Sequence, residues 1–423
     1  MQLNFIANQP VPSRTGQTLA VLDPSDGQPF DALQRSDARD IDDAVRAARE
    51  CLDTGWSRLS AAERSRLLMR LSARVAEHAD ELAALEQRDC GKPTRQARAD
   101  AAALVRYFEF YAGSCDKLHG ETIPYQDGYS VFTWREPHGV TGHIIPWNYP
   151  MQIFGRSVGG ALAAGNVCVV KPAEDACLSL LRVAQLAAEV GFPAGAINIV
   201  TGYGHEVGDA LARHPGIDHI SFTGSPHVGT LIQQVAAERH CPVTLELGGK
   251  SPQIVFADAD LDAAIPVIIN AIVQNAGQTC SAGSRLLIED AAYEQLLQRL
   301  GQAFAALRVG PATMDLDAGP LIRASQLQRV AGFLDEAQAA GITTVAQGTV
   351  VAEAPATGFY QAPVLLRDVP VNHRLAQEEV FGPVLAAMRF RDEDHAVELA
   401  NATKFGLVAG VWTRDGGRQF RMA

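Results

Sequence analysis

The sequence lacks long apolar runs, an excess of basic residues and any regular pairing of cysteines. No stretch approaches the roughly 20 uninterrupted apolar residues of a membrane-spanning helix. The formal net charge is -12, and phosphates are bound by basic faces rather than acidic ones. We therefore expect neither a nucleic acid nor a membrane as a partner.

The cysteines and the first residues indicate a cellular compartment. Seven cysteines are an odd number and include no CxxC pair, so neither a disulfide framework nor a zinc ribbon is expected. Residues 1–16 (MQLNFIANQPVPSRTG) show no basic segment followed by an apolar one, as a secretory signal would. These features predict a soluble protein of the reducing cytoplasm.

The remaining composition is that of an ordinary globular chain, and the pattern predicts an α/β protein. With 423 residues, 47% of them hydrophobic, the chain is too long for one typical core. Residues 36–118 have helical periodicity, which over 60–93 continues for about nine turns and predicts one long helix. Residues 121–136 alternate like strands, with Asp127 and Gly128 placed for a tight hairpin turn.

Between residues 138 and 256, short apolar runs alternate with helical segments. This order indicates βαβ units and a parallel sheet that is covered on both faces. After Gly249 a second α/β part begins, with helices expected at 261–275 and 291–307. The expected architecture is two α/β parts and a projecting hairpin, without repeats or low-complexity tracts.

Polar residues at the ends of the expected strands are candidates for a site, because parallel strands present functional loops at their carboxyl ends. Asn148 follows one strand, and its amide is suited to donating to an oxyanion. Lys171 and Glu174 follow the next, and suit ribose hydroxyls. Ser225 precedes a proline that suits a first helical turn, whose N–H groups attract pyrophosphate. Glu246 is followed by paired glycines that permit close approach of a ligand.

Cys280 lies in the stretch NAGQTCSAGSR, residues 275–285. A structural cysteine normally packs as a small hydrophobe among larger apolar residues. Here the neighbours are Thr279, Ser281 and Gly283, which leave the sulfur approachable. The stretch therefore indicates a thiol that takes part in chemistry.

Six motifs, PWNYP, KPAE, FTGS, LELGGKSP, GQTC and EEVFGPV, occur in an order that resembles the NAD(P)-dependent aldehyde dehydrogenase superfamily over essentially the whole chain. The resemblance implies a Rossmann-type parallel-sheet cofactor domain, an α/β catalytic domain and an oligomerisation hairpin. The dinucleotide-binding domain would comprise residues 1–118 and 138–248, the hairpin 119–137 and the catalytic domain 249–423. A homodimer or homotetramer is implied as well.

The resemblance also assigns roles to residues of this chain. Cys280 would attack the aldehyde carbon, Asn148 and the Cys280 N–H would hold the oxyanion, and Glu246 would activate water to hydrolyse the thioester. No metal is implied. The implied cofactor-binding residues are Ile144, Ile145, Trp147, Lys171, Glu174, Gly224, Ser225, Gly248, Glu379 and Phe381. The implied substrate residues are Tyr149, Ile153, Arg156, Thr279 and Ser281.

Cofactor and substrate preference depend on single side chains. Glu174 would repel a 2′-phosphate and so favours NAD over NADP, unless it turns outward and Lys171 tolerates both. Tyr149, Ile153 and Arg156 share a helix face, and semialdehyde dehydrogenases resemble this chain in having an arginine there. Arg156 would then bind a distal carboxylate or sulfonate. Two alternatives stay open: Arg156 pairs with a neighbouring acidic loop, or the substrate is an aryl aldehyde.

Other motifs favour structural interpretations. The GxSxG pattern at 155–159 lies within an expected helix over 150–164, whereas a hydrolase elbow needs a strand, a turn and a helix. GYGHEVG at 202–208 is interpreted as a turn into a helix rather than a Rossmann fingerprint. Residues without metal-ligand spacing or with a packing role are His214, His219, His227, His240, Cys168 and Cys241.

Two other functions are weighed beside a hydrolytic NAD-dependent enzyme. A CoA-acylating relative would generally lack the base, so Glu246 argues against that class. The chain stops at TRDGGRQFRMA, where family members normally continue for several dozen residues. An inactive remnant that binds dinucleotide is therefore the other alternative, against which Cys280, Glu246 and Asn148 argue.

Overall fold

A computed structural model describes all residues from Met1 to Ala423. Its contacts divide the chain into two compact units. The first unit consists of Met1–Leu22, Pro29–Cys90 and Ala97–Glu246, and the second of Asp23–Gln28, Gly91–Gln96 and Leu247–Ala423. Segments 23–28 and 91–96 thus belong to the second unit, which no sequence pattern had indicated.

The first unit is built on a seven-stranded sheet with the order β11-β10-β7-β8-β9-β1-β2. The strands from β7 to β11 run parallel, as the alternating pattern predicted, whereas β1 pairs antiparallel with β9. The strands are β1 (Asn4–Ile6), β2 (Gln9–Val11), β7 (Val140–Ile145), β8 (Val167–Pro172), β9 (Ile197–Ile199), β10 (His219–Thr223) and β11 (Val243–Glu246).

The strand order reverses at β7. From β7 the chain continues to β8 and then β9 on one side, whereas β10 pairs with β7 on its other side and is followed outward by β11. In open parallel sheets, ligands bind in the crevice at such a reversal, outside the carboxyl ends of the strands. The loops after β7 and β10 therefore flank the expected binding position of this unit.

Helices pack against this sheet: α1 along β7, β8 and β9, α5 on β7 and β8, and α8 on β10 and β11. The helices that precede Glu246 are α1 (Ala38–Thr54), α2 (Ala61–Glu77), α3 (Ala79–Cys90), α4 (Thr94–Ala112), α5 (Pro150–Ala163), α6 (Leu178–Glu189), α7 (Asp209–Arg213) and α8 (Pro226–Ala237). None of the chain's helices combines the length and the apolar character that crossing a bilayer requires.

The prediction of one long helix over residues 60–93 is wrong. The structure has two helices there, because the backbone leaves helical geometry at His78, with φ -106° and ψ 15°. The His78 ring bonds the Glu81 carboxylate in the first turn of α3, at 2.6 Å. Both helices pack on α6, but only α2 also packs on α5. Both halves share the same apolar periodicity, so the sequence pattern did not reveal the break.

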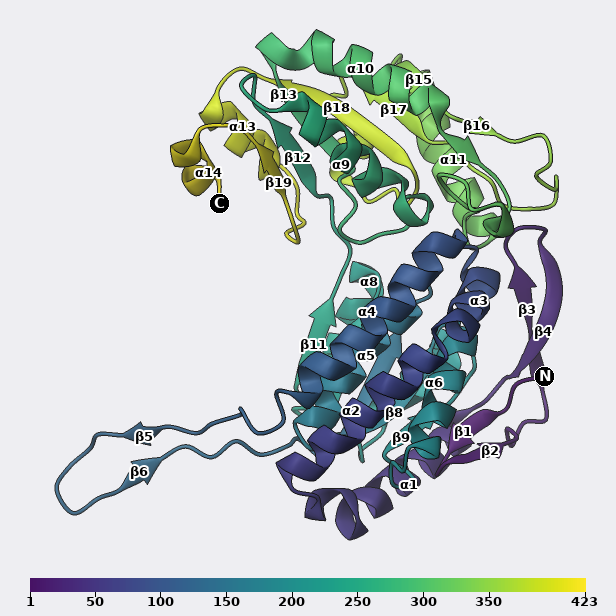
Figure 1. Ribbon diagram of the computed structural model, residues 1–423, viewed down its shortest axis with the longest axis vertical. Coiled ribbons are helices and arrows are strands. Elements are labelled where there is room, and N and C mark those ends of the chain that lie inside the picture. Colours follow the sequence, from purple (N-terminus) through teal and green to yellow (C-terminus); the bar gives the residue numbers. More distant parts are fainter. The chain divides into compact units, whose positions relative to one another are not determined.

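The hairpin of β5 (Thr122–Ile123) and β6 (Val131–Phe132) extends away from the helices of the first unit (Figure 1). The predicted turn is present: Gly128 has φ +85°, and the Tyr129 N–H donates to the Gln126 carbonyl. Along the hairpin, large side chains are exposed, namely Ile123, Tyr125, Tyr129, Phe132 and Trp134.

Strands before residue 36 were not predicted from the sequence. β1 and β2 form a hairpin whose turn residues, Ala7 and Asn8, both have positive φ. β3 (Thr18–Asp23) and β4 (Gln28–Gln34) pair with each other. A three-residue strand such as β1 is too short for its periodicity to be recognised, and alanine gives no signal for a left-handed turn.

The second unit is built on a six-stranded sheet with the order β15-β17-β18-β13-β12-β19. All neighbours are parallel except β15, which runs antiparallel to β17. The strands are β12 (Pro252–Val255), β13 (Arg285–Glu289), β15 (Thr343–Gln347), β17 (Val364–Arg367), β18 (Val384–Phe390) and β19 (Gly410–Trp412), with β14 (Arg308–Val309) and β16 (Thr349–Val350) in a separate pair.

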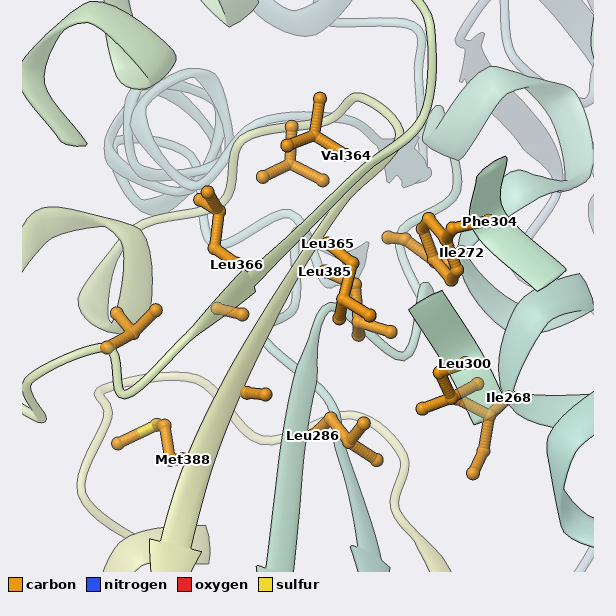
Figure 2. Close-up of a cluster of buried hydrophobic side chains, with 14 of the residues drawn as sticks. Ile268, Ile272, Leu286, Leu300, Phe304, Val364, Leu365, Leu366, Leu385 and Met388 are labelled. Carbon is orange, nitrogen blue, oxygen red and sulfur yellow. The ribbon is translucent and has the colours of Figure 1, made fainter. Parts of the chain in front are cut away.

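Apolar side chains of strands and helices form the core of the second unit. Figure 2 shows Leu286, Leu365 and Leu385 on adjacent strands, and Ile268, Ile272, Leu300 and Phe304 on the helices beside them. The helices are α9 (Leu261–Val273), α10 (Tyr293–Ala306), α11 (Ala324–Ala339), α12 (Arg374–Gln377), α13 (Glu393–Ala400) and α14 (Gly416–Met422). The predicted helices after 261 and 291 are confirmed as α9 and α10.

Candidate functional site

In the first unit, the candidate residues lie at the carboxyl ends of the parallel strands. Ile144 and Ile145 end β7, and the following loop carries Trp147 and the buried Asn148. α5 begins directly afterwards, with Pro150 in its first turn. Proline suits that position because the first helical residues have no intrahelical partner for their N–H groups. The loop that carries Asn148 therefore leads directly into the first turn of α5.

Lys171 and Glu174 form an ion pair at the end of β8. The Lys171 Nζ lies 2.7 Å from the Glu174 Oε2, and the lysine is almost fully buried. Ile144 pairs in register with Lys171, so this ion pair lies on the strand beside the Asn148 loop. A buried charge requires such a partner, and the pair presents oxygen and N–H groups for a polar ligand.

The ends of β10 and β11 are joined through the main chain. Gly224 follows β10 and donates its N–H to the Glu246 carbonyl at 3.0 Å, which fixes the last residue of β11. Ser225 then caps α8, and its Oγ accepts from the Val228 N–H, while Pro226 is the first helical residue as predicted. The exposed amino end of α8 thus follows β10, one of the two strands at the reversal of the sheet.

In the second unit, Cys280 follows an unusual stretch of backbone. α9 ends at Val273, and the next three residues after Gln274, namely Asn275, Ala276 and Gly277, all have positive φ. This explains why the helix ends before the predicted residue 275. The Gln278 side chain holds the loop, donating to the Asn275 carbonyl at 3.0 Å and accepting from the Ile322 N–H at 2.9 Å.

Cys280 differs from the other cysteines in exposure. It is half-buried, whereas Cys51, Cys90, Cys115, Cys168, Cys177 and Cys241 are buried. Burial raises the pKa of the Cys168 thiol to about 12 and also raises that of Cys241. The packing role predicted for these two agrees with their burial, and Cys280 is the one cysteine that is not fully buried.

Three main-chain segments of the second unit meet around Cys280. A Cβ on Gly249 would lie 2.5 Å from the Cys280 carbonyl oxygen. A Cβ on Gly277 would overlap the backbone of Gly382, and one on Gly248 would overlap the Glu379 carboxylate. Real Cβ atoms do not approach backbone so closely, so glycine is required at 249 and 277, whereas a side chain at 248 would displace the Glu379 carboxylate. The LELGG, GQTC and EEVFGPV motifs are therefore neighbours in the fold.

Glu379 rests on the backbone of Gly248 and Gly249. Its Oε1 accepts the Gly249 N–H at 3.1 Å, and burial raises the pKa of the carboxyl group despite this bond and nearby cations. Phe381 has a positive φ of 59°. The loop thus presents a carboxylate and an aromatic ring from a strained backbone.

A model of the aldehyde dehydrogenase family matches residues 11–423. The chain belongs to this family.

Relatives and solved structures agree with that membership. A Bacillus subtilis protein named as an aldehyde dehydrogenase, DhaS, is 40% identical over 97% of this chain and 83% of its own. A Burkholderia cenocepacia crystal structure assigned as an aldehyde dehydrogenase is 71% identical, with a TM-score of 0.99, over 99% of this chain and 89% of that one. An aldehyde dehydrogenase of Bacillus cereus, solved as an NAD+ complex, has a TM-score of 0.96 and 37% identity over 100% and 86%.

The substrate residues expected from the resemblance lie in different surroundings. Ile153 of α5 is buried, and so is Thr279, which precedes Cys280. Tyr149 and Ser281 are half-buried. Arg156 is exposed on α5 and forms no ion pair with an acidic loop, so the structural alternative for it is not observed. Tyr111 of α4 is close enough for Arg156 to lower its pKa, against the larger raising effect of burial.

Two positioning residues were missed from the sequence. Arg329 of α11 donates to the Glu379 carbonyl at 2.6 Å, and Gln326 donates to the Phe381 carbonyl at 2.7 Å. They lie three residues apart on one face of α11, and both bind the main chain of the Glu379–Phe381 loop in this aldehyde dehydrogenase. Because both bind main-chain oxygens, no motif links them to the loop.

The two motifs for which the sequence favoured a structural interpretation, at 155–159 and 202–208, lie in helical surroundings. The GxSxG pattern at 155–159 is inside α5, without a strand and turn before its serine. GYGHEVG leads through a π-helical turn, Gly204–Gly208, into α7. Neither has the context of the function that its pattern resembles.

The exposure of the thiols makes a prediction about their reactivity. In the native protein, we expect a disulfide reagent such as 5,5′-dithiobis(2-nitrobenzoic acid) to label Cys280 first, because only approachable thiols react. Cys280→Ser should remove the fast phase, and Cys241→Ser should leave it unchanged. The account fails if the fast phase survives in Cys280→Ser.

Proposed function

We propose that the chain oxidises an aldehyde to a carboxylic acid with NAD, using Cys280 as the nucleophile. The observation that carries this proposal is Cys280 itself, the accessible cysteine among seven, on a loop that glycines bring against Gly249 and Gly382. Membership of the aldehyde dehydrogenase family supports the reaction class. We expect the protein to act in the cytoplasm.

Attack by the Cys280 thiolate on the aldehyde carbon would give a thiohemiacetal. Its oxygen becomes negative, and the Asn148 amide and the Cys280 N–H would donate hydrogen bonds to it. Asn148 is suited to this role because it is buried and lies directly before the start of α5. A buried donor that needs no reorganisation stabilises developing charge more than a mobile one.

Loss of hydride from the same carbon would convert the thiohemiacetal into a thioester on Cys280. NAD, when bound, supplies the acceptor for this hydride. Glu246 would then take a proton from water, whose oxygen attacks the thioester carbonyl, releasing the carboxylic acid and the Cys280 thiolate. Its position at the end of β11, held by the Gly224 N–H, supports this assignment.

The residues present fit a dinucleotide in each unit separately. In the first unit, Lys171 and Glu174 would bind the adenosine ribose, and Ser225 at the amino end of α8 would bind pyrophosphate beside the strand reversal. In the second, Glu379 would bind the nicotinamide ribose and Phe381 would contact its ring. The half-buried Glu174 carboxylate favours NAD over NADP.

The substrate that we propose is an aldehyde with a distal anionic group. Arg156 is eight residues after Asn148, which corresponds to about 12 Å along a helix, and helical side chains tilt toward the amino end. Its guanidinium is exposed and has no carboxylate partner within the chain. A short semialdehyde whose oxygen binds Asn148 would therefore place its carboxylate near Arg156.

We also propose that the hairpin, residues 119–137, joins copies of the chain into a homo-oligomer. Its exposed aromatic residues, including Phe132 and Trp134, support this role, because contiguous apolar groups in water mark interaction sites. The remaining domain roles follow the resemblance: dinucleotide binding by the first unit and catalysis by the second.

The direct test is NADH formation, followed at 340 nm, with the purified chain and a panel of aldehydes without CoA. We expect turnover that falls about a thousandfold or more in Cys280→Ala and persists in the matched variant Cys241→Ala. Asn148→Ala should lower kcat by about 10²- to 10³-fold. NADH formed only when CoA is added would instead indicate the CoA-acylating class, and NADH binding without turnover an inactive binder.

Arg156 makes a separate prediction about specificity. Arg156→Leu should raise KM for anionic semialdehydes at least about tenfold and leave KM for benzaldehyde-type substrates unchanged, because only the former lose a charged hydrogen bond. Arg70→Leu, which removes another exposed arginine from a helix of the same unit, is the control. Equal effects of Arg156→Leu on both substrate groups would mean that this arginine is structural.

A further inference from the structure

Lys250 is a buried lysine to which the proposed reaction gives no role. It follows Gly248 and Gly249 directly, is only 2% exposed, and its Nζ makes no hydrogen bond within the chain. Its carbonyl accepts from Arg285 Nε at 2.8 Å, which fixes the backbone at this point. Burial of an ammonium without a hydrogen bond is unfavourable, so its charged form must be stabilised by other charges nearby.

The charges around Lys250 come from two elements. Arg285 of β13 repels the ammonium, while Glu379 and Glu378 of the loop after α12 attract it. Glu378 already has a partner in Arg374, at 3.0 Å. Glu379 has no ion pair, and the cations that act on it are Lys250 and Arg329 of α11, whose guanidinium donates to main-chain carbonyls.

The two groups are linked through the glycines between them. The Glu379 carboxylate lies on Gly248 and accepts the Gly249 N–H at 3.1 Å, and Lys250 is the next residue. Burial, with a smaller effect of Arg285, lowers the pKa of Lys250 to about 7. Burial raises the pKa of Glu379, and Lys250 opposes that rise. Each group therefore favours the charged form of the other without direct contact.

We propose that Lys250 is a positioning residue that keeps the Glu379 carboxylate ionised and seated on the Gly248–Gly249 backbone, ready to accept hydrogen bonds from ribose hydroxyls. The ribose is that of the nicotinamide half of the dinucleotide, so the inference rests on the proposed function. Lys250 is too buried to touch a ligand and acts through Glu379 alone.

The effect of Lys250 should depend on pH in a way that packing cannot imitate. Below about pH 7 the ammonium is charged and lowers the pKa of Glu379; above that it is neutral and has no such effect. Lys250→Met fills similar volume without charge, so the pKa of Glu379 should rise and the carboxyl group should be protonated at higher pH than in the unsubstituted chain. Affinity for NADH would then fall by up to about tenfold at acidic pH and equal that of the unsubstituted chain above pH ~8.5.

The experiment is a fluorescence titration of NADH from pH 5.5 to 9 with four variants: Lys250→Met, Lys250→Arg, Glu379→Gln and the double substitution of Met at 250 and Gln at 379. Lys250→Arg keeps the charge at every pH, so its NADH affinity at acidic pH should equal that of the unsubstituted chain. Glu379→Gln should remove the dependence of NADH affinity on acidic pH. Adding Lys250→Met to Glu379→Gln should change nothing further, because the carboxylate through which Lys250 acts is gone.

Several results would overturn the inference. Equal weakening by Lys250→Met at every pH, or additive effects in the double variant, would mean that the lysine only fills space. These results would not contradict the proposal that the chain binds a dinucleotide. Failure of the unsubstituted chain to bind NADH would instead overturn the proposed function, and the inference with it.

Discussion

The close approach of three main-chain segments in the second unit underlies the rest of the site. Gly249 lies against the Cys280 carbonyl, Gly277 against Gly382, and Gly248 beneath Glu379. At 249 and 277 a Cβ would overlap backbone atoms, and at 248 it would displace the Glu379 carboxylate. The position of the Cys280 loop and that of the Glu379 carboxylate therefore both depend on these glycines.

Two pairs of oppositely charged groups also belong to the candidate site. Lys171 forms an ion pair with Glu174. Lys250 and Glu379 form no ion pair, and the Glu379 carboxylate instead accepts the N–H of Gly249, the residue before Lys250. The first arrangement is a stable ion pair, and the second leaves a carboxylate with acceptor capacity for a ligand. Both cost desolvation energy that a merely structural site would avoid. The position of Lys171 and Glu174 at the end of β8 agrees with a protein whose ligand carries hydroxyl groups.

The sequence predicted the parts of the site that depend on local pattern. Asn148, Lys171 and Ser225 follow strands whose apolar runs are unmistakable, and Cys280 is marked by its small neighbours. Arg329 could not be predicted, since its partner is a main-chain oxygen fifty residues away in the sequence.

Other features depend on tertiary packing or on backbone geometry. The break at His78 separates two helices of the same apolar periodicity, both of which pack on α6. The left-handed Asn275 and Ala276 carry no glycine signal, so the early end of α9 was hidden. The significance of Lys250 emerged only from its burial and from the place of Glu379.

The central claim is that Cys280 carries the acyl group and that Glu246 is needed to release it. Mass spectrometry of Glu246→Gln, quenched after mixing with NAD and an aldehyde, tests this claim most directly. The account predicts an acyl group on the peptide that contains Cys280, and none when NAD is omitted. An acyl group on a different cysteine, or no accumulation in a variant that has also lost turnover, would contradict it.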